Sequence, residues 1–287
     1  MTCRPCVKAA SAATGLALAA AAVLWAMPAR AADMPEDDTF LRGTLAPAEL
    51  PRWDGIVFGA QFGLMNMNTD FGNGTSSMVA YMLRNTTIEN EGHVSEWTTL
   101  PSNTTNSRSY GIFLGYNVQW GELVVGIDGA YNHPSTLEAS ATDSINRRFT
   151  TTDGYENNVT VSAASSLKLI DYATLRARAG YAFGQFLPYA VLGAAVGRFN
   201  YTTSATTTAS GTDISGGGGS PYGPTTQSQT ESRNNSIVGG FVAGLGMDVA
   251  LLPNVFLRGE WEFVAFAPVH GLRANINTAR VGIGLKF

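Results

Sequence analysis

The sequence predicts an all-β protein, an eight-stranded antiparallel up-and-down transmembrane β-barrel with long extracellular loops and short periplasmic turns. Three observations support this fold class. The closing segment, Asn275 to Phe287, alternates apolar residues with charged residues and glycines. The connections between the expected strands alternate between long and short. Charged residues make up 14% of the chain, below the ~25% of a typical soluble domain, yet the mean hydropathy is only +0.02.

The closing segment has two chemically different faces, because successive strand side chains point to opposite sides. Ala279, Val281, Ile283, Leu285 and Phe287 share one side, and Arg280, Gly282, Gly284 and Lys286 share the other. Such a strand suits lipid outside and a crowded polar interior inside. Its free edge must be covered, so we expect it to pair with the first strand and close a barrel.

Residues 1–31 have the pattern of a cleaved signal peptide. A basic start (Arg4, Lys8) precedes an uncharged apolar run, and Ala29-Arg30-Ala31 offers small residues for cleavage. A transmembrane helix is the rival interpretation, but the run is shorter than the ~20 residues that a span needs. We expect residues 32–52, with prolines and a cluster of acids, to form a flexible periplasmic lead-in and residues 53–287 to form the barrel.

Cleavage of this segment would remove both cysteines, Cys3 and Cys6. We therefore expect no disulfide, thiolate metal site or cysteine nucleophile in the mature chain. The loss of three basic residues would leave 15 basic and 22 acidic residues, a net charge of −7. A basic nucleic-acid footprint is absent from the sequence.

Eight segments show the alternation of a strand with one apolar face. They cover about 53–64, 109–119, 122–132, 168–183, 186–200, 237–250, 255–266 and 275–287. An even number of strands is what a closed bacterial barrel requires. In the fifth segment Arg198 shares the phase of the apolar residues, which predicts a β-bulge there.

Three connections are long, at about 68–108, 133–167 and 201–236, and they alternate with tight turns at Gly121, Gly184 and Pro253. Long loops at one end and short turns at the other are typical of outer-membrane barrels with the loops outside the cell. We expect the third loop, a Ser/Thr-rich tract with four consecutive glycines, to lack enough apolar surface to order itself. Asp153-Gly154 in the second loop predicts a hairpin that extends two strands beyond the membrane.

The chain resembles the small eight-stranded outer-membrane barrels of alphaproteobacteria, in the superfamily of the OmpA transmembrane domain and the opacity-type surface antigens. The motifs that carry the resemblance are Trp53-Asp54-Gly55, Gly126-Ile127-Asp128-Gly129, the segment Leu175 to Ala182, Phe186-Leu187-Pro188-Tyr189 and the ending from Arg280 to Phe287. They cover most of the strands and none of the long loops. The resemblance implies an abundant surface protein with roles in envelope integrity and contact with a host or another surface. With no peptidoglycan-binding domain following Phe287 in this sequence, we do not expect anchoring to the cell wall by that route.

Charged residues fall on the inward faces of the expected strands: Asp128, Arg176, Arg178, Asp248, Arg258, Glu260, Glu262, Arg280 and Lys286. They could form a polar track for ions or solutes, as in a small porin. We favour a packed plug of mutually neutralising charges, because eight strands leave an interior that side chains just fill. We expect Asp128 to pair with Arg176 and Arg178, Glu260 and Glu262 with Arg280, and Asp248 with Arg258.

A lipid-modifying enzyme is the rival from another class, and it would need a base beside a nucleophile. The histidines are His93, His133 and His270, and Ser135 follows His133 at the spacing of one strand face. No nucleophile motif surrounds that pair, so we expect no enzyme, no cofactor and no metal. Aromatic residues at strand ends predict interfacial girdles: Trp53, Tyr110, Trp120, Tyr131, Phe183, Phe266 and Phe287.

The expected partners follow from the barrel and its place in the outer membrane. They are outer-membrane lipid and lipopolysaccharide, the barrel assembly machinery, and a host or surface ligand at the loops. We expect Phe287 to act as the assembly signal.

Overall fold

The computed structural model describes residues 51–72, 74–268 and 271–287. The described residues belong to one compact unit, residues 50–287. The expected signal peptide and most of the expected lead-in lie outside the described residues, as does His270.

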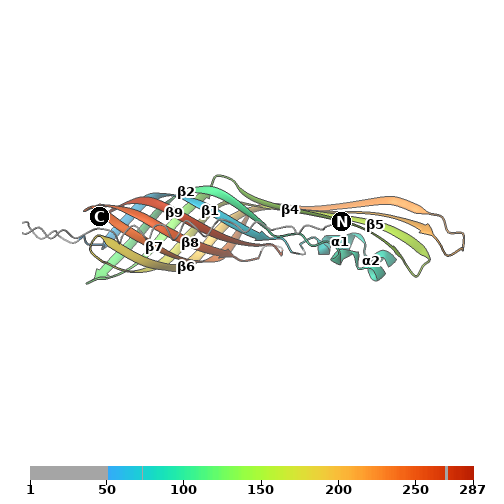
Figure 1. Ribbon diagram of the computed structural model, residues 1–287, viewed down its shortest axis with the longest axis horizontal. Helices are drawn as coiled ribbons and strands as arrows, with labels where there is room; N and C mark the ends of the chain where they lie inside the picture. The colour runs from blue at the N-terminus through green and yellow to red at the C-terminus, as the bar shows by residue number, and fades with distance from the viewer. Residues whose placement is uncertain (1–50, 73, 269–270) are drawn as a thin grey trace, which may run out of the picture. The chain divides into compact units, whose positions relative to one another are not determined.

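This unit is built from one antiparallel sheet that closes on itself (Figure 1). Its strands are β1 (Gly55–Asp70), β2 (Asn103–Trp120), β3 (Leu123–Pro134), β4 (Leu137–Thr150), β5 (Tyr155–Tyr181), β6 (Phe186–Asp213), β7 (Tyr222–Leu252), β8 (Val255–Phe266) and β9 (Arg273–Lys286). The order is β3-β2-β1-β9-β8-β7-β6-β5-β4, and an additional β3–β5 pairing closes the ring. Eight strands form the barrel, as predicted, and β4 is a ninth strand at the edge of β5 outside it.

Pairing of the first and last strands closes the barrel, as the sequence predicts. The two strands run antiparallel from Val57 beside Lys286 to Asp70 beside Arg273. The Ile56 amide donates to the Phe287 carbonyl at 3.0 Å, and the Phe287 amide donates back to Ile56 at 2.9 Å. The eight described barrel strands therefore leave no unpaired edge, which is what a sheet in lipid requires.

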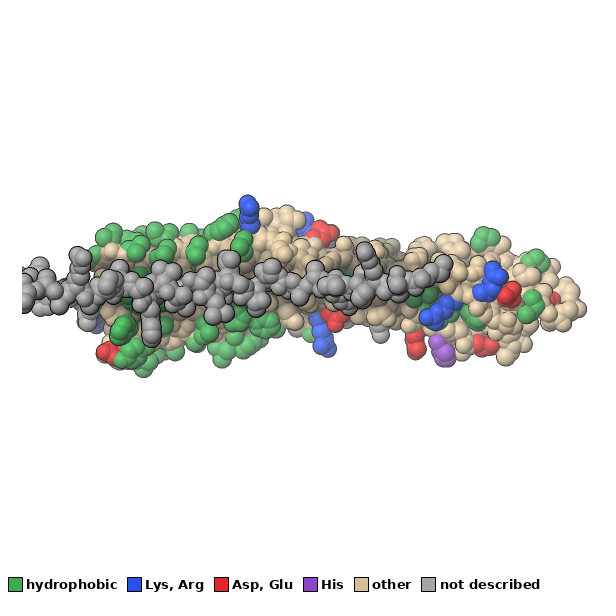
Figure 2. Space-filling model, viewed as in Figure 1, with side chains coloured by type: hydrophobic (Ala, Val, Ile, Leu, Met, Phe, Trp, Pro, Cys, Tyr) green, Lys and Arg blue, Asp and Glu red, His purple; other side chains and the backbone are tan. Residues whose placement is uncertain are grey.

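The outer wall of the barrel is apolar. Alternate side chains such as Leu64, Ile112, Leu175 and Leu245 are exposed, while their sequence neighbours point inward. Figure 2 shows hydrophobic side chains gathered over the barrel strands and mostly uncharged polar surface over the rest of this unit. Lipid would cover the apolar part.

Beyond the barrel, β5, β6 and β7 continue as a four-stranded sheet with β4, here called the extension (residues 137–169 and 201–233). The hairpin predicted at Asp153-Gly154 is confirmed by the β4–β5 pairing on either side of it. The expectation that the third loop stays unordered is wrong, because β6 and β7 pair as far as Gly211 beside Tyr222. Threonine favours strands, and here the strands extend a register already set inside the barrel.

Two β-bulges lie where the barrel gives way to the extension. In β5 the register with β6 shifts between Leu169 and Asp171. In β7 the three residue steps from Ser236 to Arg233 lie opposite the two steps from Phe199 to Tyr201 on β6. The sequence predicts a bulge in β6 at Arg198, whereas the structure has one in each of the two neighbouring strands, β5 and β7. Each bulge reverses the alternation of its strand, so the face that lines the lumen continues as one face of the extension.

Residues 75–97, predicted to be part of a loop, contain short helices: α1 (Ser76–Met82), α2 (Thr87–Gly92) and the 3-10 helix η2 (Val94–Glu96). Their apolar side chains pack against the extension strands β5 and β6. The cluster consists of Met78, Val79, Leu83, Ile88, Val94, Val159, Val161, Ala205 and Ala209. One face of the extension is thereby covered and the other is left open.

Gly55 is required at the seam between β1 and the end of the chain. Its φ is +108°, and a Cβ there would lie 2.0 Å from the Phe287 carbonyl oxygen. We expect Gly55→Val to lower the free energy of unfolding by ~1–3 kcal/mol or more, since a strained backbone and a clash add. Reversible urea unfolding in lipid vesicles measures this.

Gly259→Ala is the matched control, because nothing lies within 4 Å of the position of its Cβ. We expect it to be neutral. Equal loss of stability in the two variants would contradict the role assigned to Gly55.

Candidate functional site: the sealed lumen and the extension

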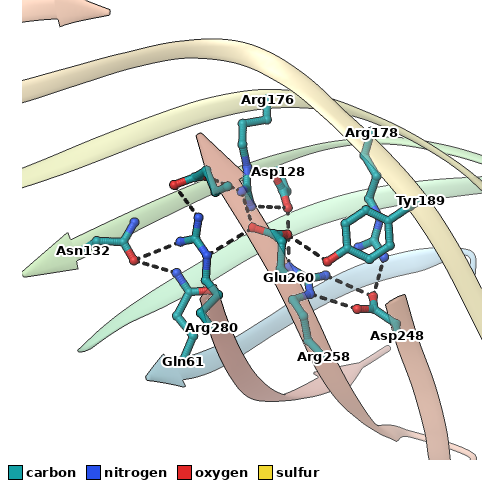
Figure 3. Close-up of polar contacts among 11 residues, drawn as sticks. Gln61, Asp128, Asn132, Arg176, Arg178, Tyr189, Asp248, Arg258, Glu260 and Arg280 are labelled. Atoms are coloured by element: carbon teal, nitrogen blue, oxygen red, sulfur yellow. Dashed lines mark hydrogen bonds and ion pairs between the residues drawn. The ribbon is translucent and has the colours of Figure 1, made fainter. Parts of the chain in front are cut away.

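The middle of the lumen is a layer of eight buried charges (Figure 3). Four are arginines, Arg176, Arg178, Arg258 and Arg280, and four are acids, Asp128, Asp248, Glu260 and Glu262. We call these eight residues the charge layer. Its formal charge is zero, which is the condition for tolerating ionised groups away from water.

Arg176 lies at the centre of the layer. It donates to Asp128 through Nε at 2.8 Å and Nη2 at 2.9 Å, and through Nη1 to Glu260 at 2.5 Å and Glu262 at 2.6 Å. Arg280 Nε lies 3.2 Å from Glu260, and its Nη2 pairs with Glu262. The pairings expected for Asp128 with Arg176 and for Arg280 with both glutamates are present in the structure.

A second group of pairs lies on the other side of Asp128. Arg258 donates to Asp248 at 3.0 and 3.1 Å, as expected, and also to Asp128 at 3.4 Å. The expected pair of Arg178 with Asp128 is wrong, because Arg178 bonds Asp248 instead. The Arg178 guanidinium also lies 3.6 Å from the ring centroid of Tyr189. The stacked Tyr189 ring supplies part of the stabilisation that the remaining guanidinium nitrogens of Arg178 lack.

Four neutral residues that the sequence interpretation missed complete this network. Tyr189 donates to Glu260 at 2.8 Å, and Tyr172 donates to Glu262 at 3.2 Å. Gln61 Nε2 and Arg280 Nη1 donate to Asn132 Oδ1 at 2.6 and 3.2 Å. Strand alternation in β1, β3 and β6 could have found Gln61, Asn132 and Tyr189, whereas the bulge in β5 hides the facing of Tyr172.

An apolar layer closes the lumen at the end of the short turns. It consists of Trp53, Val57, Phe113, Val124, Ala130, Leu187, Ala250 and Phe256. Trp53 was expected in an interfacial girdle, but it is 1% exposed and packs edge-on to Phe256. Lys286 bonds the Arg52 carbonyl and lies 4.9 Å from the Trp53 ring, so it is at the lumen mouth and outside the charge layer.

A second apolar layer closes the lumen at the end that joins the extension. Met65, Met67, Phe71, Phe199 and Phe266 are among its buried members. Phe266, also expected in a girdle, is 6% exposed and packs edge-on to Phe199 at 5.0 Å. Tyr110, Trp120, Tyr131, Phe183 and Phe287 are exposed, as girdle residues are.

The lipid-facing wall has an ion pair near the end that joins the extension. Arg198 Nε donates to Asp171 at 2.7 Å, and the Tyr131 hydroxyl donates to the same carboxylate at 2.8 Å. His133 lies 5.2 Å from the ring of Tyr110 on this wall. Among the described residues no hydrogen bond joins His133 to Ser135, whose amide donates to the Arg108 carbonyl.

Polar contacts also attach helix α2 to the β4–β5 turn. Thr87 donates to Asp153 at 2.9 Å, and Glu91 accepts from the Thr152 amide at 2.9 Å. Hydrogen bonds from Thr151 and Thr87 hold the pKa of Asp153 below its usual value. The helices are thus attached to the extension by polar bonds at its tip as well as by the apolar cluster.

Residues 58–287 match the family model for the outer membrane protein beta-barrel domain. The chain belongs to this family. As an outer membrane protein beta-barrel domain, it is located in the bacterial outer membrane, in contact with membrane lipid. In the described part of the chain no helix is long and apolar enough to cross a membrane, and no group of three or more His, Cys, Asp or Glu residues could hold a metal ion.

Several solved structures are similar to the chain, among them the following three. Ail, the attachment invasion locus protein of Yersinia pestis, is 11% identical, with a TM-score of 0.33 over 82% of this chain and 99% of Ail. Neisserial surface protein A is 13% identical, with a TM-score of 0.31 over 80% of this chain and 97% of that protein. OprG from Pseudomonas aeruginosa is 10% identical, with 0.34 over 82% and 97%. TM-scores this low carry no argument about function. No curated protein matches the chain.

Removal of one arginine tests the balance of the charge layer. We expect Arg280→Ala to lower the free energy of unfolding by ~3–5 kcal/mol, because it leaves a carboxylate buried without its partner. Adding Glu262→Gln should restore part of the loss, since it returns the layer to zero charge. Urea unfolding followed by tryptophan fluorescence measures both.

The exposed Arg148→Ala in β4 is the control for loss of an arginine elsewhere. It should change stability by less than ~0.5 kcal/mol. A triple variant with both Glu260→Gln and Glu262→Gln should be less stable than the Arg280→Ala, Glu262→Gln pair, because it carries one excess positive charge. The opposite order would contradict neutralisation as the function of the layer.

Proposed function

We propose that the protein is a non-enzymatic outer-membrane surface protein whose sealed barrel holds a folded extension for contact with a host or another surface. The observation that carries this is the continuity of β5, β6 and β7, each of which runs without a break from the barrel into the extension. A binding surface on such strands is held in place by the barrel and loses little entropy when it is used. The anchored barrel would also contribute to envelope integrity.

The small-porin alternative receives little support from the lumen. Two apolar layers lie on either side of a neutral, fully interlinked charge layer. An ion would have to cross both apolar layers without water, which is energetically prohibitive.

In planar bilayers we expect no steady conductance from the wild-type protein. The Phe199→Ala, Phe266→Ala variant, which thins the apolar layer at the end that joins the extension, should still conduct little because the Trp53 layer remains. A stable, ion-selective current in the wild type would promote the porin alternative.

A lipid-modifying activity remains the weaker alternative. His133 lies against Tyr110 on the outer wall, and the structure gives it no hydrogen bond to a nucleophile in the described residues. A catalytic site needs such convergence. We therefore assign no residue a catalytic role.

The finer aspects of the assignment are also part of the proposal. The motifs that resemble the alphaproteobacterial barrels support an origin in that group. Phe287, exposed and stacked on Phe58 at 5.8 Å, is available as a terminal signal for the barrel assembly machinery. The exposed Arg108 and Arg198 near the extracellular rim favour contact with lipopolysaccharide phosphates.

Adhesion by cells that display a trimmed protein tests the surface role. Trimming both hairpins at the paired residues Ala139 and Leu167, and Thr203 and Glu231, and closing each with a tight turn should leave the barrel intact. We expect the trimmed cells to lose most of the attachment to surfaces that wild-type cells show. Equal attachment at equal display levels would refute the proposed function.

A further inference from the structure

The open face of the extension carries a regular array of small polar side chains, the hydroxyl grid. It consists of four rows that cross β4, β5, β6 and β7 in register. From the barrel outward the rows are Ser140, Ser166, Thr202 and Ser232; Thr142, Ala164, Ser204 and Thr230; Ser144, Ser162, Thr206 and Ser228; and Asn146, Thr160, Thr208 and Thr226. None of these residues is buried.

The sixteen positions of the grid carry no charge, and the charged residues of the same face flank it: Glu138 and Lys168 toward the barrel, Arg148 and Glu156 toward the tip. Fifteen of its sixteen side chains are Ser, Thr or Asn, and the other is Ala164. A typical protein surface is ~25–35% charged, so about five charged residues would be expected among sixteen. The opposite face, by contrast, carries the apolar residues that α1 and α2 cover.

Hydrogen bonds within the rows fix many of the hydroxyls. Ser144 bonds Ser162 at 2.9 Å, Thr206 bonds Ser228 at 3.0 Å, and Thr208 bonds Thr226 at 3.0 Å. Each hydroxyl has one proton and two lone pairs, so every such pair keeps one donor and several acceptors for a ligand.

The centre of the grid, between β5 and β6, is different. Within the grid no side-chain hydrogen bond crosses from β5 to β6 in the described structure, although Ser162 faces Thr206 and Thr160 faces Thr208. Facing Cβ atoms on neighbouring strands are ~4.5–5.5 Å apart. That separation suits a ligand hydroxyl that accepts from one side chain and donates to the other.

The size and chemistry of the grid disfavour a protein as its partner. Strand spacings of ~4.8 Å across and ~6.8 Å along give an area of about 500 Å². Stable protein interfaces bury ~800 Å² on each partner and centre on aromatic or arginine anchors. The grid has no such anchor. Its fixed neutral donors and acceptors suit a ligand that is itself uncharged and repeats hydroxyl groups.

We propose that the hydroxyl grid binds neutral polysaccharide chains that lie across its rows. This inference rests on the proposed surface-contact function and names its ligand class. Each contact is weak, so binding depends on the number of sugar units that engage the grid together. A charged glycan would meet no opposite charge within the grid, because Lys168 and Arg148 on the same face lie in the rows that flank it.

Binding of fluorescein-labelled dextran and of cello-oligosaccharides to the refolded full chain tests the proposal, with heparin as the charged comparison. At least one of the two neutral glucans should bind about tenfold or more tightly as a long chain than as a disaccharide. Ser162→Lys combined with Thr206→Lys should weaken that binding about tenfold. Ser77→Lys combined with Asn90→Lys, on exposed positions of the helices, adds the same charge and should have no effect.

Several results would overturn the proposal. They are a failure of both neutral glucans to bind, tighter binding of heparin than of the neutral glucans, and an equal loss of glucan binding in the two double-lysine variants. A dimer in sedimentation that only the Ser162, Thr206 pair abolishes would assign the grid to a second copy instead. Trimming separates this inference from the proposed function: if trimmed cells lose attachment while the Ser162, Thr206 lysine variant keeps it, the glycan assignment fails and the surface role stands.

Discussion

The buried charge layer is the constraint on which the rest of this barrel depends. An eight-stranded ring leaves room for side chains and little else. Arg176 on β5 contacts three acids on two other strands, Asp128 on β3 and Glu260 and Glu262 on β8. Opposite charges on β3, β5 and β8 can meet only if the ring closes in one register. The network therefore stabilises that register relative to a slipped one. A slip of one residue would turn these charges toward lipid.

The same register carries outward into the extension. Because β5 and β7 each have a bulge at the rim, the lumen-facing side of the wall continues as the helix-covered side of the extension. The lipid-facing side continues as the hydroxyl grid. The Ser/Thr-rich segment is ordered because its strands are already paired inside the membrane, and because Val159, Val161 and Ala205 gain apolar neighbours from the helices.

Most of the barrel could be predicted from the sequence because strand alternation is a local signal. Leu175, Arg176, Ala177 and Arg178 show their facing without reference to any partner. The pairing of Arg178 could not be predicted in this way, since strand height alone does not distinguish Asp128 from Asp248. Trp53 was misplaced for a similar reason: an aromatic residue before the first strand can sit in the interface or fold over the lumen mouth, and Lys286 and Phe256 decide between the two.

The β4–β5 half of the extension could be predicted from the Asp153-Gly154 turn, but the β6–β7 half could not, because its composition alone does not show the strands beside which it lies. The grid and the covered face alternate along β6 as Thr202, Thr203, Ser204 and Ala205, and both faces are too polar to indicate a buried side. Only the register with β5 shows that Ala205 and Val161 lie on the same covered face while Ser162 and Thr206 lie on the open one. A surface with that regularity requires strands held at fixed spacing, and the sealed barrel below supplies them. In this protein a closed lumen and an ordered outer face are therefore two results of one register.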